Sequence, residues 1–119
     1  MKMLNLAIVD DSTTDLYILS SNFKKIDYIK IKMMALNGAD FIAKLENEKP
    51  DLDLLLIDLR MPVLNGIDTI KILNQMKINF KIIAMSHGYS LLHWSNYSNW
   101  VSNIIVRKTL KLFWRIFLR

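Results

Sequence analysis

The chain has no cysteine among its 119 residues. No disulfide can therefore hold the fold, which suits a reducing cytoplasm. The chain also lacks any run of about 18 or more apolar residues, so no membrane span is expected. A single lysine precedes a strand pattern at the N-terminus, without the small-residue cleavage site of a signal peptide. These absences predict a cytoplasmic protein.

Acidic residues are missing from the last 51 residues, because all 11 Asp and Glu lie at or before Asp68. That segment holds 8 Lys and Arg, a charge of +8, whereas the first 68 residues hold 8 basic and 11 acidic residues, a charge of −3. Two interpretations stay open. The basic half is either a generally basic surface or a face for an acidic partner, nucleic acid or an anionic membrane.

The length and the 52% hydrophobic content predict one packed domain spanning residues 1–119. Apolar runs predict strands at Leu4–Val9, Ile29–Ala35, Leu54–Asp58, Lys81–Met85 and Asn103–Arg107. Helical spacing predicts helices at Thr13 to about Lys25, Ala39–Asn47, Gly66 to about Met76, Ser90 to about Trp100 and Leu110–Leu118. This alternation predicts an α/β fold, a flavodoxin-like doubly wound parallel sheet of order 2-1-3-4-5 with helices on both faces.

The second predicted strand differs from the others in its polar residues. Ile29, Ile31 and Met33 alternate there with Lys30 and Lys32, which indicates one wet face. We expect this strand at an edge of the sheet.

Polar side chains follow four of the predicted strands. Asp10 and Asp11 close the first, Asp58 the third and Ser86 the fourth, and Lys108 follows the fifth. The carboxyl ends of parallel strands meet at one edge of a sheet, where ligands bind. Three acids, a hydroxyl and an amine at this edge are the parts of a magnesium-dependent phosphoryl-acceptor site, although each residue alone is more often a cap, turn or surface residue.

In type, order and spacing, these residues resemble the receiver domain of two-component response regulators, from Leu4 to about Ile116. Ser86 lies 28 residues after Asp58, and Lys108 lies 22 after Ser86. The stretch from Ala35 to Ala39 looks like the family's exit from the second strand. The family motif D-x-x-M-P-x-x-x-G is present in full, as Asp58, Met61, Pro62 and Gly66.

The resemblance implies a role for each residue. Asp58 would take a phosphoryl group from a phosphohistidine of a sensor histidine kinase or phosphotransfer protein, and would then switch contacts with an unknown downstream protein. Ser86 and Lys108 would contact the phosphoryl oxygens. Mg²⁺ would relieve the repulsion among the carboxylates. The implied ligands are Asp11 and Asp58 directly, Asp10 largely through water, and the backbone carbonyl of Arg60.

The chain departs from the family pattern on its output side. Ile105 occupies the switch position where the family usually has an aromatic residue, and Thr109 stands where a proline often follows the lysine. The C-terminal half also carries Trp94, Trp100 and Trp114. These aromatic residues leave open a homodimer or partner surface formed by predicted helix four, strand five and helix five.

Three other functions are weighed against a phosphorylated receiver. The chain could be a pseudo-receiver scaffold that is not phosphorylated, which Ile105 favours slightly, or the receiver part of a truncated DNA-binding regulator. Nucleic-acid binding by this domain alone is not expected. An aspartyl-phosphate hydrolase would want an acid where Arg60 stands, so the protein is predicted not to be an enzyme.

Overall fold

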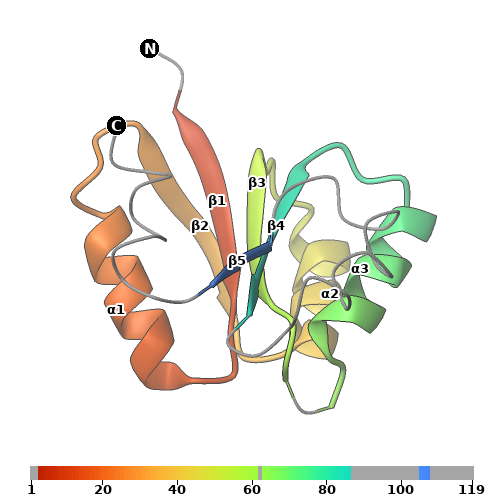
Figure 1. Ribbon diagram of the computed structural model, residues 1–119. Coiled ribbons are helices and arrows are strands. Elements are labelled where there is room, and N and C mark those ends of the chain that lie inside the picture. The colour runs from red at the N-terminus through yellow and green to blue at the C-terminus, as the bar shows by residue number, and fades with distance from the viewer. Residues whose placement is uncertain (1–2, 62, 87–104, 108–119) are drawn as a thin grey trace.

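The computed structural model describes residues 3–61, 63–86 and 105–107. Its five parallel strands pair in the order β2-β1-β3-β4-β5, as the sequence predicted. Helix α1 lies on one side of the sheet, and α2 and α3 lie on the other (Figure 1). In chain order the elements are β1 (Leu4–Val9), α1 (Thr13–Phe23), β2 (Ile29–Ala35), α2 (Gly38–Glu48), β3 (Leu54–Asp58), α3 (Gly66–Gln75), β4 (Lys81–Ser86) and β5 (Ile105–Arg107).

The predicted boundaries differ from the observed ones by at most two residues in the described part of the chain. The first three strands match, and β4 runs one residue further, to Ser86. Helix α1 ends at Phe23 rather than Lys25, and the backbone N–H of Lys24 donates to the carbonyls of Ser20 and Asn22. The predicted helices at 90–100 and 110–118, and the first two residues of predicted strand five, lie outside the described residues.

Strand β1 is buried on both faces, and its side chains enter two separate cores. Ala7 and Val9 join the core beneath α2 and α3, whereas Leu6 and Ile8 join the core beneath α1. This alternation follows from the two-residue period of a strand. The helices supply matching apolar side chains at helical spacing. These are Leu16, Leu19 and Phe23 from α1, Phe41, Ile42 and Leu45 from α2, and Ile67, Ile70 and Leu73 from α3.

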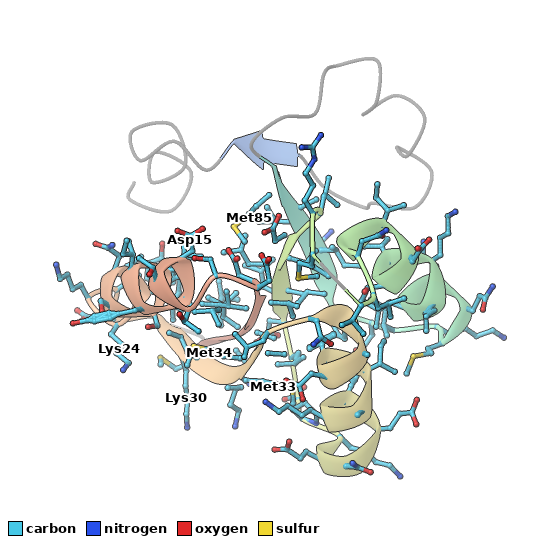
Figure 2. All side chains as sticks on the ribbon, turned by 90° about the horizontal axis from the view of Figure 1, so that it is seen from below. Asp15, Lys24, Lys30, Met33, Met34 and Met85 are labelled. Atoms are coloured by element: carbon cyan, nitrogen blue, oxygen red, sulfur yellow. The ribbon has the colours of Figure 1, made fainter. Side chains whose placement is uncertain are left out.

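Strand β2 is an edge strand, as predicted, but its odd-numbered residues do not share one face. The pairing with β1 shifts by one residue between Leu6 and Ala7, so Lys32 has no partner in the register. Such a bulge reverses the side-chain alternation beyond it. Ile29 and Ile31 therefore pack on the side of α1, while Met33 is buried on the side of α2 and α3, and Met34 is left exposed (Figure 2).

Asp53 lies at the end of the sheet where the parallel strands begin, and it joins three of them. Its Oδ2 accepts a hydrogen bond from the backbone N–H of Asn5 at 2.8 Å. Its own N–H donates to the carbonyl of Asn5 at 2.9 Å, and its carbonyl accepts from the N–H of Lys81 at 3.1 Å. Just before β3, this residue therefore ties together the beginnings of β1, β3 and β4. We call the end of the sheet where the strands begin the amino edge, and the end where they finish the carboxyl edge.

Candidate acidic site at the carboxyl edge

Three aspartates meet where β1 and β3 end. Asp10 and Asp11 follow β1, and Asp58 is the last residue of β3, its direct neighbour in the sheet. One carboxylate oxygen from each lies within 4.8 Å of the others. Asp10 and Asp58 are 0% and 5% exposed, and Asp11 is open to solvent. The pairing of β1 with β3 thus gathers residues that are 47 and 48 positions apart in the sequence.

The two buried carboxylates are oriented by the turns that follow them. Asp10 Oδ1 accepts a hydrogen bond from the backbone N–H of Ser12, and Asp58 Oδ1 accepts one from the N–H of Arg60, both at 3.0 Å. These bonds to the residue two positions on are typical of Asp in a turn. They hold each carboxylate at the strand end, where it faces its neighbours.

The cluster is electrostatically unfavourable on its own. Two unit charges at 4.8 Å repel by about 1 to 3 kcal/mol for effective dielectric constants of about 80 to 20. Oxygen ligands of high charge density in this arrangement suit a small hard cation such as Mg²⁺, which is bound in proteins by one or two carboxylates and several waters. The donor set that the structure presents therefore fits the magnesium site expected from the sequence.

The three described helices all begin at the carboxyl edge, each with a side-chain N-cap. Ser12 Oγ accepts from the N–H of Asp15, while Asn37 Oδ1 and Asn65 Oδ1 accept from the N–H groups three residues ahead of them, at Asp40 and Asp68. The sequence analysis identified neither asparagine as a helix cap. The repeated pattern Ser/Asn-x-x-Asp was the signal that could have identified all three.

The loop from Leu59 to Gly66, which we call the acceptor loop, connects Asp58 to α3. The N–H of Gly66 donates to the carbonyl of Leu59 at 3.1 Å and closes the loop. A Cβ on Gly66 would lie 2.3 Å from the carbonyl oxygen of Asp58, so only glycine fits against this strand end. Met61 is buried beneath the loop, whereas Val63 is 83% exposed with φ of 71°, and Pro62 lies outside the described residues.

The other predicted site residues are placed only in part. Ser86 ends β4 at the same edge as the acids and pairs in register with Arg107. Ile105 pairs with Ala84, two residues further from that edge. Lys108 directly follows Arg107 and lies outside the described residues.

Comparison with known proteins agrees with this architecture. The family described as the response regulator receiver domain matches residues 6–93. Over 86 residues the chain is 35% identical to a protein-glutamate methylesterase/protein-glutamine glutaminase of Clostridium acetobutylicum, covering 72% of this chain and 24% of that protein. Over 79 residues it is 35% identical to the chemotaxis protein CheY of Thermotoga maritima, covering 66% of this chain and 63% of that protein. The chain thus spans about a quarter of the methylesterase and less than two thirds of this CheY.

Solved structures show the same fold. A CheY-like receiver domain protein of Methanospirillum hungatei aligns with a TM-score of 0.80 and 20% identity, covering 98% of this chain and 90% of that one. CheY in the CheX-CheY-BeF3-Mg+2 complex of Borrelia burgdorferi aligns with a TM-score of 0.76 and 24% identity over the same shares.

The fold and the clustered acids define a doubly wound α/β domain with an acidic site beyond its strand ends. The chain belongs to the response regulator receiver domain family, whose role is phosphoacceptor signalling in two-component systems. Among the described residues, no helix is both long and apolar enough to cross a membrane.

Proposed function

We propose that Asp58 is the phosphoryl acceptor of this chain and that Asp10, Asp11, Asp58 and the Arg60 carbonyl hold Mg²⁺ beside it. The observation that carries this proposal is the gathering of three carboxylates within 4.8 Å, two of them buried. Carboxylates this close repel one another, and a hard cation bound by all three would relieve that repulsion.

The chemistry follows from the position of Asp58. One of its carboxylate oxygens attacks the phosphorus of a phosphohistidine, the phosphorus–nitrogen bond breaks, and the imidazole leaves with the electron pair while an acyl phosphate forms. The backbone N–H of Arg60 orients the carboxylate through Oδ1. When bound, Mg²⁺ supplies charge neutralisation for the phosphoryl oxygens. Ser86 and Lys108 would contact these oxygens from the ends of β4 and β5.

The donor is a sensor histidine kinase or a phosphotransfer protein, and the phosphorylated form changes its contacts with a downstream protein. A phosphoryl group on Asp58 can shift a two-state equilibrium only through contacts that differ between the two states. Ser86 and Lys108 provide such contacts because both would engage the phosphoryl group. Ile105 fills the switch position without a ring, so the packing change at that position differs from the usual aromatic one.

Incubation with acetyl phosphate and Mg²⁺, followed by intact mass measurement, tests the proposal. Wild type should gain one phosphoryl group, and Asp58→Asn should gain none. Asp53→Asn is the matched control, because it replaces a carboxylate at the other edge of the same sheet and should leave the gain intact. If wild type gains no phosphoryl group while a competent receiver does so in parallel, the chain is a pseudo-receiver scaffold and the proposal is wrong.

A further inference from the structure

Helix α2 begins directly against helix α3, with almost no space between them. The first residue of α2 is Gly38, and a Cβ built there would lie 1.8 Å from Thr69 Oγ1 and 2.8 Å from the carbonyl oxygen of Leu64. Real Cβ atoms essentially never approach other atoms below 3.0 Å. Any larger residue at this position must therefore displace α3, the acceptor loop or α2 itself.

The same contact fastens the acceptor loop to α2. The N–H of Gly38 donates to the carbonyl of Leu64 at 3.2 Å. Thr69 is fully buried, and its Oγ1 donates to the carbonyl of Asn65 at 2.7 Å. Gly66 is joined to Leu59 by the bond that closes the loop. Three consecutive residues of the loop are thus held by hydrogen bonds. The partner of Leu64 is in α2, that of Asn65 is in α3, and that of Gly66 is Leu59 at the start of the loop.

The position of residues 64–66 determines where the beginning of the acceptor loop lies. Leu59 is joined to Gly66 at one side and donates its N–H to the carbonyl of Met85 in β4 at the other. Arg60 follows Leu59, and its N–H orients the Asp58 carboxylate. A shift of Leu64 and Gly66 therefore reaches the turn that orients Asp58 and presents the Arg60 carbonyl, although neither Gly38 nor Thr69 belongs to the acid cluster.

We propose that Gly38 and Thr69 are positioning residues. They hold the acceptor loop where the Asp58 carboxylate and the Arg60 carbonyl are placed for metal binding and phosphoryl transfer. The proposal rests on the proposed function of Asp58. The absent side chain of Gly38 lets α2 approach, and the Thr69 hydroxyl fixes the loop's last turn. A side chain added at Gly38 displaces the loop through Leu64. It therefore weakens Mg²⁺ binding even in protein whose α2 remains folded.

Four proteins separate positioning from a merely structural role: wild type, Gly38→Ala, Gly38→Ala with Thr69→Ala, and Ala43→Gly. Ala43 is an exposed residue of α2, so glycine there weakens the same helix by about 1 kcal/mol without touching the loop. The double variant removes the Oγ1 atom that the new Cβ meets. Circular dichroism fixes a temperature at which all four are folded. The Mg²⁺ dissociation constant is then measured by calorimetry, and the rate of phosphorylation by acetyl phosphate is measured by mass.

Gly38→Ala should weaken Mg²⁺ binding by about tenfold or more, the range that residues supporting metal ligands show. The double variant should bind Mg²⁺ no better than Gly38→Ala, because the new Cβ still meets the Leu64 carbonyl and the hydroxyl bond to Asn65 is lost. Ala43→Gly should bind Mg²⁺ as wild type does. A Gly38→Ala protein that melts earlier but keeps the wild-type Mg²⁺ affinity and phosphorylation rate would overturn the positioning role and leave the acceptor role of Asp58 standing. A wild type that binds no Mg²⁺ would overturn both.

Thr69→Val provides a second test if Gly38→Ala does not fold. It removes the hydroxyl bond to Asn65 and keeps the volume of the side chain. Its Mg²⁺ affinity should fall by several-fold in folded protein, in keeping with loss of one support of the site. An affinity equal to that of wild type would contradict the positioning role.

Discussion

The two edges of the sheet both carry aspartates, and they use them in opposite ways. At the amino edge, Asp53 joins three strands through hydrogen bonds to Asn5 and Lys81. At the carboxyl edge, Asp10 and Asp58 accept from the turns two residues ahead of them and face each other and Asp11. The acid that stabilises the fold accepts a hydrogen bond from the backbone of another strand. The acids proposed to bind a ligand lie close together, where they repel one another.

The largest change in stability is expected at the amino edge. Asp53→Ala leaves the N–H of Asn5 without its carboxylate partner, and a hydrogen bond to a charged group contributes about 1.5 to 3 kcal/mol. Urea denaturation should show a loss of this size. Asp51→Ala, an exposed residue of the same link, should change stability by less than about 0.5 kcal/mol. If both variants lose equally little, Asp53 does not tie the strands together.

The opposite sign is expected at the carboxyl edge. Asp58→Asn removes one charge from the cluster and can still accept from the N–H of Arg60, so it should stabilise the metal-free protein by about 1 to 2 kcal/mol at low salt. Asp11→Asn should gain less, because solvent screens that exposed carboxylate. Denaturation in EDTA measures both effects. A loss of stability in Asp58→Asn would show that the edges do not differ in the way proposed.

A smaller effect is expected from backbone strain. Val63 in the acceptor loop has φ of 71°, a conformation that β-branched residues rarely adopt, and no packing offsets it because the side chain is 83% exposed. Val63→Asn should therefore stabilise the protein by about 0.5 to 1 kcal/mol. Lys49 also has a positive φ, of 46°, at the end of α2, but it is unbranched, so Lys49→Asn should gain less. Thermal denaturation compares the two. Equal gains would show that the branch at Val63 carries no strain.

The sequence predicted the sheet order and the gathering of the acids because both depend on local patterns. Apolar runs of strand length fixed the strands, and the polar residue after each run marked the carboxyl edge. It was harder to predict which residues of a strand share one face of the sheet and which helices they contact. The bulge at Lys32 reverses the alternation of β2 without any glycine or proline to announce it, so Met33 was assigned to the same face as Ile31.

The supports of the site depend on contacts between elements, which a sequence does not display. Asn37 and Asn65 were missed as caps although the pattern was present three times in the chain. The fit of Gly38 against Thr69 needed the positions of two helices that are 31 residues apart at that contact. The sequence gives no sign of the role of Asp53, and only the register of β3 against β1 and β4 shows what it binds.

Thermal denaturation with and without Mg²⁺ tests the central claim most directly. A ligand that binds only the folded state stabilises it by about 2.7 kcal/mol at one hundred times its dissociation constant. Mg²⁺ should raise the melting temperature of wild type and of Asp53→Asn alike, and should leave a variant carrying Asp11→Asn and Asp58→Asn unchanged. An equal rise in that double variant, or no rise in wild type, would contradict a magnesium site at the carboxyl edge.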